Sequence, residues 1–118
     1  RLEQAVVHLV QNAIEASPPT EPVTLRVRTV RDQAVIEVID KGCGMSTHFI
    51  RTDLFKPFTS TKDGGFGVGA FEARALVTAM GGRLDVQSRE GEGTTFSIFL
   101  PLARDSANMS TEDKVKAA

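Results

Sequence analysis

The chain has 118 residues, of which 41% are hydrophobic and 25% charged, and its formal net charge is −1. These values predict one globular domain with a real core. They argue against a general nucleic-acid-binding surface, which is usually strongly basic. No apolar run reaches the roughly 18 residues of a membrane span, and no signal peptide is visible. The only cysteine, Cys43, excludes an internal disulfide. We expect it to be a small packed thiol in a reducing, cytoplasmic setting.

Hydrophobic periodicity divides the chain into helices and strands. The predicted helices cover residues 1–17 and 68–80, and the predicted strands cover 23–30, 34–39, 83–88 and 94–100. Apolar residues alternate in the first strand, so it should be half-buried. The segment between the second strand and the second helix should hold one short helix at most, as in a functional lid. This order predicts an α+β fold, a two-layer α/β sandwich with helices on one face of a mixed or antiparallel sheet.

The predicted domain covers residues 1–102, and the polar residues 103–118 are expected to be a frayed tail. The first predicted helix begins at Arg1 with no capping residue before it. We therefore expect this chain to be a piece of a longer protein, and we expect the piece to be monomeric. It contains no internal repeat.

His8 and Asn12 are four residues apart on the first predicted helix, so their side chains share one face. An amide oxygen at Asn12 could coordinate Mg²⁺, which prefers oxygen ligands. His8 could orient or deprotonate a nearby water or hydroxyl group. Considered alone, a polar pair satisfied at the border of the helix is the simpler interpretation.

Asp40 ends an apolar strand, and Gly42 and Gly44 follow it within residues 40–45. A carboxylate in this position can accept a hydrogen bond from a flat ligand that carries an amino group, such as adenine. Glycines would let the backbone approach such a ring. An ordinary Asp-x-Gly turn is an equally good interpretation. Thr94 follows a glycine-rich turn and could present its hydroxyl to a ligand, although a structural turn is the simpler view there.

A second glycine-rich stretch precedes the second predicted helix. Gly65, Gly67 and Gly69 would expose backbone amides at the helix N-terminus, which favours phosphate. Lys62 would add a positive charge. The glycine spacing fits neither the dinucleotide-binding pattern nor the Walker pattern. A flexible connector is the alternative interpretation.

The order and spacing of these motifs together resemble the ATP-binding catalytic domain of bacterial sensor histidine kinases. That domain belongs to the GHKL (Bergerat) superfamily, which also contains gyrase, Hsp90 and MutL ATPase domains. The matching segments are the N box at 8–13, the G1 box at 40–45, the F box at 54–58, the G2 box at 65–69 and the last turn at 91–96. Sequences beside the F and G2 boxes further resemble sensor kinases of exosortase (PEP-CTERM) systems.

The resemblance implies a role for each matched position. Asn12 would bind Mg²⁺ and act with His8 at the catalytic centre. Asp40 would accept from the adenine amine, with a water and Thr94 completing the edge of the ring. The implied nucleotide-binding residues are Asn12, Asp40, Gly42, Gly44, Met45, Lys62, Gly65, Gly67, Val68, Gly69 and Thr94.

Three positions depart from the family pattern. His8 stands where many members have Asn or Glu, which leaves its role as a base open. Glu15 replaces a phosphate-contacting Lys, and Ala16 replaces an aromatic residue that stacks on adenine. Both changes could weaken ATP binding. Phe55 and Phe58 match the family and would anchor the lid to the domain.

The resemblance implies a protein histidine kinase domain in two-component signalling. It would bind Mg-ATP and donate the γ-phosphoryl group to a histidine on a separate dimerisation domain that is absent from this chain. A response regulator would be the downstream partner. Neither nucleic acid nor membrane is expected to contact this segment, although the full-length protein could be membrane-anchored. The alternative, favoured by Glu15 and Ala16, is a degenerate nucleotide-sensing or protein-interaction module without kinase output.

Overall fold

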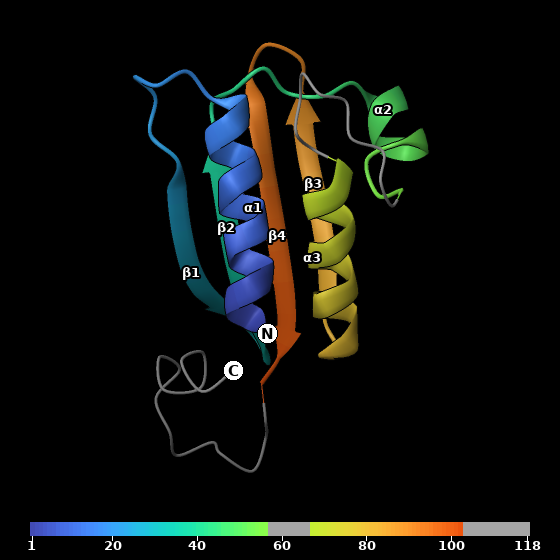
Figure 1. The fold of residues 1–118 in the computed structure, drawn as a ribbon. Coiled ribbons are helices and arrows are strands. Elements are labelled where there is room, and N and C mark those ends of the chain that lie inside the picture. Colours follow the sequence, from blue (N-terminus) through green and yellow to red (C-terminus); the bar gives the residue numbers. More distant parts are fainter. Residues whose placement is uncertain (57–66, 103–118) are drawn as a thin grey trace.

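The computed structural model describes residues 1–56 and 67–102. Its elements, in chain order, are α1 (Leu2–Ala16), β1 (Thr24–Val30), β2 (Gln33–Asp40), α2 (Thr47–Thr52), α3 (Gly67–Ala79), β3 (Arg83–Arg89) and β4 (Gly93–Pro101). Helices α1 and α3 lie side by side over one face of the sheet, and α2 lies beyond β3 (Figure 1). The structure thus confirms the predicted two-layer α+β fold.

The four strands form one sheet in the order β1-β2-β4-β3. Every pairing among them is antiparallel, so the sheet is antiparallel and not mixed within the described residues. The central strands are β2 and β4, and their register places Asp40 opposite Thr94. The end of β2, the start of β4 and the start of α3 lie at the same end of the molecule (Figure 1). That end therefore collects the residues that the motifs single out.

The hydrophobic core lies between the helices and the sheet. Leu2, Ala5, Leu9 and Ala13 are buried on α1, at the spacing of one helical face. Alternate residues of the central strands supply the opposite side, including Val38, Phe96 and Ile98. Phe96, Leu9 and Leu54 are the largest fully buried side chains. Leu54, from the segment after α2, joins this core and so ties that segment to the domain.

The ends of the helices follow the sequence signals. The pair Pro18-Pro19 follows α1, and the Ser17 hydroxyl donates to the Ala13 carbonyl at 2.6 Å. Ser46 caps α2, with its Oγ accepting from the Phe49 N–H at 3.0 Å. Gly81 follows α3 with a φ of 80°, a left-handed conformation that glycine adopts without strain.

Strand β1 differs from the prediction, because all seven of its residues are exposed. Leu25 is 53% exposed and Val27 is 49% exposed, although both lie on the same face of the sheet as the core residues of β2. The reason is that α1 packs over β2 and leaves this edge strand uncovered. Ile14 on α1, which is 59% exposed, adds to the same uncovered apolar surface. The expectation of a half-buried strand was therefore wrong.

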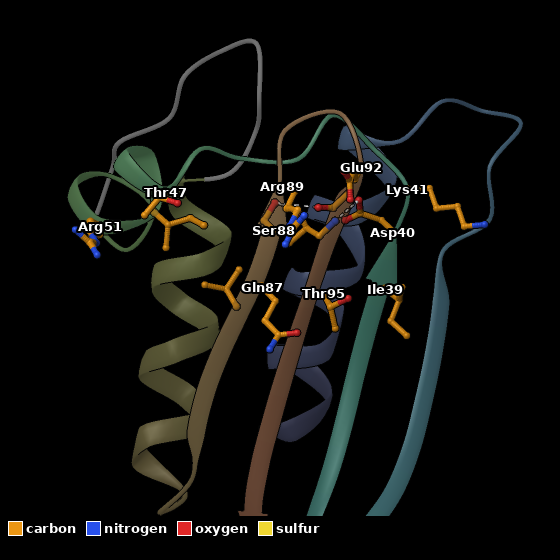
Figure 2. Close-up of a pocket in the computed structure, with 14 residues that line it drawn as sticks. Ile39, Asp40, Lys41, Thr47, Arg51, Gln87, Ser88, Arg89, Glu92 and Thr95 are labelled. Carbon is orange, nitrogen blue, oxygen red and sulfur yellow. Dashed lines mark hydrogen bonds between the residues drawn. The ribbon is translucent and has the colours of Figure 1, made fainter.

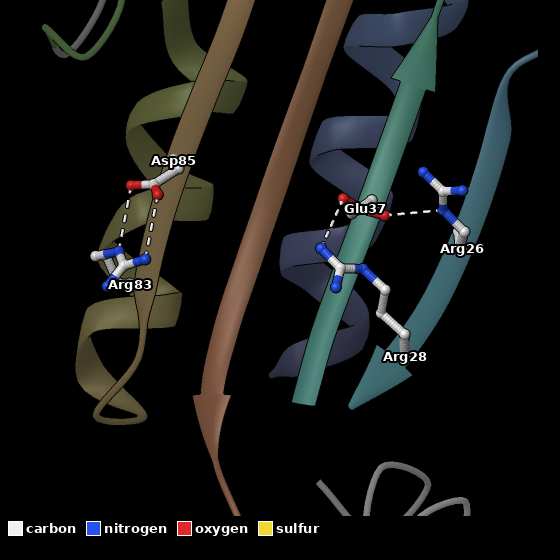
Figure 3. Close-up of polar contacts among 5 residues, drawn as sticks. All are labelled: Arg26, Arg28, Glu37, Arg83 and Asp85. Atoms are coloured by element: carbon white, nitrogen blue, oxygen red, sulfur yellow. Dashed lines mark hydrogen bonds and ion pairs between the residues drawn. The ribbon is translucent and has the colours of Figure 1, made fainter. Parts of the chain in front are cut away.

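A charged cluster lies on the sheet face opposite the helices (Figure 3). Glu37 Oε1 accepts from Arg26 Nε at 2.9 Å, and Glu37 Oε2 lies 3.5 Å from Arg28 Nη2. Burial acts to raise the pKa of Glu37, but the hydrogen bonds and charges of the two arginines outweigh it, so the pKa is lowered. On β3, Arg83 pairs with Asp85 at 3.2 Å in a more exposed setting.

Replacing Glu37 with Gln is expected to lower the free energy of unfolding by about 1 kcal/mol at pH 7, since the partner arginines are half exposed. Because the folded-state pKa of Glu37 lies below its ordinary value of 4.5, this contribution is present above that value and fades as the pH falls through the folded-state pKa. Urea unfolding at pH 7 and pH 3 measures it. Asp85→Asn is the matched control, with a change near zero. An equal Glu37→Gln loss at both pH values would contradict the assignment.

Candidate nucleotide-binding site

Asp40 lies at the end of β2 and is only 4% exposed. Its Oδ1 accepts two backbone hydrogen bonds, from the Gly42 N–H at 2.8 Å and from the Thr94 N–H at 3.2 Å. Burial raises the pKa of the Asp40 carboxyl, and these two hydrogen bonds act in the opposite direction. Among the described residues, no group hydrogen-bonds to Oδ2. One oxygen is therefore held by the protein, and the other is free to accept from a ligand.

Three glycines surround the Asp40 carboxylate because the backbone packs too closely there for a side chain. A Cβ at Gly42 would collide with the Ala16 carbonyl, and one at Gly93 would collide with the Asp40 carbonyl. A Cβ at Gly44, which has a φ of 71°, would likewise collide with the Arg89 carbonyl. The G1 loop is thus clamped between the end of α1 and the β3–β4 turn. These glycines serve the protein's own packing, whatever they also do for a ligand.

Ser88 is a residue of this cluster that the sequence analysis did not single out. Its Oγ accepts from the Met45 N–H at 2.8 Å, lies 3.0 Å from the Gly93 carbonyl oxygen and lies 2.8 Å from Thr94 Oγ1. Ser88 pairs with Thr94 in the β3–β4 hairpin. That hairpin register is the signal by which it could have been found. Met45 itself is a buried core residue, 4% exposed, and touches the cluster through its backbone.

Asn12 is 4% exposed on α1 and faces the first turn of α3. A Cβ at Gly69 would come within 2.9 Å of Asn12 Oδ1 and 3.0 Å of Nδ2. The absence of a side chain at Gly69 therefore lets α3 begin directly against the amide of Asn12. Gly67 and Val68 form the start of α3, whereas Lys62 and Gly65 lie outside the described residues.

His8 is paired with Glu72 of α3, with 3.2 Å between His8 Nε2 and Glu72 Oε1. The two residues line a small pocket of about 280 Å³ between the helices, together with Gln4, Phe71, Ala75 and Leu76. Neither Asn12 nor Asp40 lines this pocket. The observed partner of His8 is thus a carboxylate that bridges α1 and α3, and its role as a base stays a prediction.

An open pocket of about 790 Å³ borders Asp40, Ser88 and Thr94 (Figure 2). Its other walls come from α2, β3 and the start of β4. Lys41, Arg51 and Arg89 also line it, so it carries positive charge beside the carboxylates of Asp40 and Glu92. The pocket reaches the predicted adenine contact but is not lined by Asn12, Met45 or the G1 glycines.

The segment after α2 is attached to the domain through an aromatic contact. Phe55 packs against the core, and the Arg74 guanidinium of α3 lies 4.3 Å from the centre of its ring. This agrees with the anchoring role predicted for Phe55, whereas Phe58 lies outside the described residues. Cys43, expected to be packed, is exposed. Its backbone is held by the Ala16 carbonyl and the Gly91 N–H, which leaves the thiol on the surface.

Proteins with similar sequences include two that are named as sensors. The chain is 37% identical over 110 residues to the C4-dicarboxylate transport sensor protein DctS of Rhodobacter capsulatus, covering 90% of this chain and 17% of that protein. It is 34% identical over 115 residues to the sensory histidine kinase/phosphatase NtrB of Klebsiella oxytoca, covering 88% of this chain and 32% of that protein. The chain thus spans a third or less of the length of these relatives.

Solved structures give the same picture. Full-length ShkA, determined in complex with AMPPNP, matches with a TM-score of 0.74 and 26% identity, over 86% of this chain and 21% of that one. The histidine kinase AdeS of Acinetobacter baumannii matches with a TM-score of 0.66 and 26% identity, over 84% of this chain and 44% of that one. In the described part of this chain, no helix combines the length and apolar character needed to cross a bilayer.

The family comparison covers nearly the whole chain. Residues 1–104 match the family described as histidine kinase-, DNA gyrase B- and HSP90-like ATPase. The fold, the position of Asp40 at the end of a central strand and the glycine-rich start of α3 all agree with that match. The chain therefore belongs to the histidine kinase-, DNA gyrase B- and HSP90-like ATPase family.

Proposed function

We propose that this domain binds Mg-ATP and donates the γ-phosphoryl group to a histidine on a separate dimerisation domain. The observation that carries the proposal is the buried Asp40 carboxylate, which is held at Oδ1 and open at Oδ2. Membership of an ATPase family and likeness to proteins named as sensor kinases support it. The acceptor histidine and a downstream response regulator would lie outside this chain, and the domain would work in the cytoplasm as a monomer.

In this proposal, Asp40 Oδ2 accepts a hydrogen bond from the adenine amine, and Thr94 contacts the same edge of the base. Gly42, Gly44 and Met45 shape the loop beside it. Backbone amides of residues 67–69, at the N-terminus of α3, would hold the phosphates, together with Lys62 and Gly65. Because phosphoryl transfer depends mainly on positioning and charge stabilisation, such a site needs no nucleophile of its own.

The residues present fit a magnesium ion bound jointly by protein and phosphate. Asn12 supplies an amide oxygen, a ligand type that Mg²⁺ accepts, and the bare Cα of Gly69 leaves that amide against the start of α3. The described residues contain no cluster of three or more His, Cys, Asp or Glu side chains that could hold a metal. Mg²⁺ would supply charge neutralisation on the phosphates when bound. Asn12 would orient this ion. His8, four residues earlier on the same helix, would orient or deprotonate a nearby water or hydroxyl group.

Phosphotransfer to a supplied acceptor tests the proposal. The purified domain, ATP labelled at the γ-phosphate and Mg²⁺ are combined with a dimerisation domain from a related sensor kinase, and acid-labile phosphate on its histidine is measured. We expect transfer to that domain and none to this chain alone. Labelling of this chain without the acceptor would contradict the proposal. Nucleotide binding without transfer to any acceptor would favour the degenerate sensing module. In that module, Glu15 and Ala16 stand in place of a phosphate-contacting Lys and an aromatic residue that stacks on adenine.

The contact between Gly69 and Asn12 leads to a prediction about magnesium. In Gly69→Ala, the added methyl group displaces the Asn12 amide by a few tenths of an ångström, while alanine favours the helix by about 1 kcal/mol. We expect the domain to stay folded and its affinity for Mg-ATP to drop about tenfold, as when the support of a metal ligand is lost. Affinity for ADP without Mg²⁺ should change much less. Calorimetric titrations with and without Mg²⁺ measure both, and equal losses would contradict the role of Asn12.

A further inference from the structure

Ser88 makes three polar contacts with the parts that surround Asp40. Its Oγ accepts from the Met45 N–H at 2.8 Å, donates to the Gly93 carbonyl at 3.0 Å and lies 2.8 Å from Thr94 Oγ1. Ser88 therefore joins the end of the G1 loop, the β3–β4 turn and the Thr94 hydroxyl in one network. Thr94 is 3% exposed and is itself tied to Asp40 through its backbone N–H.

Counting hydrogens fixes the direction of the third contact. A serine hydroxyl has one hydrogen and two lone pairs. The Gly93 carbonyl can only accept, so the contact between them uses the hydrogen of Ser88. The contact between Ser88 Oγ and Thr94 Oγ1 then requires the hydrogen of Thr94. Because that hydrogen is donated to Ser88, Thr94 Oγ1 has only lone pairs to offer a ligand.

We propose that Ser88 is a positioning residue that makes the Thr94 hydroxyl an acceptor toward the nucleotide base, and so sets the preference for a 6-amino purine. This inference rests on the proposed function. Asp40 Oδ2 and Thr94 Oγ1 both accept, which suits an exocyclic amine or a water that donates to them. At position 6, a 6-oxo purine, as in ITP, would present an acceptor oxygen in place of the amine. No hydrogen would then lie between this oxygen and the two protein acceptors, which weakens binding.

Removing the Ser88 hydroxyl releases the Thr94 hydrogen. In Ser88→Ala, the Thr94 hydroxyl can rotate toward the ligand and donate to the oxygen of a 6-oxo purine. We expect the ratio of the ITP and ATP dissociation constants to fall about fivefold, as for one neutral hydrogen bond gained or lost. If Ser88 only stabilised the fold, Ser88→Ala would weaken the binding of both nucleotides by the same factor and leave the ratio unchanged.

The experiment titrates wild type, Ser88→Ala and Ser88→Thr with Mg-ATP and Mg-ITP by calorimetry. Ser88→Thr keeps the hydroxyl and should keep the wild-type ratio. Ser97→Ala is the matched control, because Ser97 lies on the other face of β4, opposite Glu37 and Asp85 in the register. In a Thr94→Val background, Ser88→Ala should no longer change the ratio, since the hydroxyl through which it acts is gone. Thermal unfolding of each variant checks that it is folded.

The possible outcomes distinguish a failure of this inference from a failure of the proposed function on which it rests. The inference is supported if Ser88→Ala lowers the ratio of the ITP and ATP dissociation constants and if this change disappears in the Thr94→Val background. An unchanged ratio, with wild type still binding ATP, overturns the inference and leaves the proposed function intact. Equally tight binding of ITP and ATP by wild type overturns it in the same way. Failure of folded wild type to bind either nucleotide overturns the proposed function and this inference with it.

Discussion

Replacing Asp40 with Asn is expected to lower the affinity for ATP about 100-fold while leaving the fold intact. An Asn Oδ1 can still accept from the Gly42 and Thr94 N–H groups, so the loop and the hairpin stay joined. The amide nitrogen, however, would present hydrogens where Oδ2 now presents lone pairs, and it would face the adenine amine. Loss of a hydrogen bond to a charged group is worth roughly 1.5–3 kcal/mol, and the facing donors add to it.

The stability of this variant distinguishes a binding role from a structural one. Burial raises the pKa of Asp40 above its ordinary value of 3.8, so the folded state loses stability as the pH rises from that value to the folded-state pKa. The amide in Asp40→Asn carries no such charge, and the free energy of unfolding at pH 7 should be equal to or above that of wild type. Calorimetric titration and urea unfolding measure the two effects, with Asp85→Asn as the surface control. A destabilised variant that binds ATP normally would contradict the assignment.

Nucleotide binding should also weaken at low pH, because the pKa of Asp40 is raised. The adenine amine needs the ionised form of Asp40, which is lost as the pH falls through the raised pKa. Nucleotide affinity is therefore expected to decline at a higher pH than for an exposed aspartate, while the unliganded fold gains stability from protonation of this group. Calorimetric titrations over a range of pH values measure the decline.

Gly93→Ala is expected to destabilise the domain by about 4 kcal/mol, the largest effect we foresee on the fold. Gly93 has a φ of 114°, which a residue with a side chain rarely adopts, and a Cβ there would collide with the backbone of Asp40. Because the collision is with backbone, the end of β2 and the start of β4 would have to separate. The melting temperature should fall by roughly 20 °C or more.

The neighbouring glycine is a matched control for this prediction. Gly91 also has a positive φ, 81°, but a Cβ there would meet nothing within 4 Å. Gly91→Ala should therefore carry only the conformational strain, about 1 kcal/mol. Thermal and urea unfolding of the two variants compare them directly. Equal losses for Gly91→Ala and Gly93→Ala would mean that the close approach to Asp40 does not matter.

Periodicity predicted the elements well because the apolar faces of this chain are regular. Helix α1 ends where Pro18 and Pro19 predicted it, and the four strands differ from expectation by at most one residue at either end. Exposure was predicted less well. The alternation in β1 indicates which face is apolar, but only the packing of α1 over β2 decides that this face stays uncovered. The exposure of Cys43 depends on tertiary contacts in the same way.

Only part of the arrangement of the candidate site could be predicted from the sequence, because it depends on contacts between distant segments. Asp40 and Asn12 are recognisable from local motifs, but the pairing of Asp40 with Thr94 depends on the register between β2 and β4, which are far apart in sequence. Ser88 has no motif of its own and is placed by the hairpin register. The partner of His8 on α3 likewise could not be foreseen, since it depends on how two helices pack.

The most direct test of the account is an NMR titration of the isotope-labelled domain with ADP. Backbone amide signals report on each residue separately, and the Gly42 and Thr94 amides donate directly to Asp40. We predict that the largest shifts fall on these two, on Met45 and on Ser88, and that they are lost in Asp40→Asn. No shift in the folded protein would contradict an adenine site at the end of β2. Shifts confined to another surface, such as the groove that Val10, Ile14, Val23 and Leu25 line between α1 and β1, would contradict it equally.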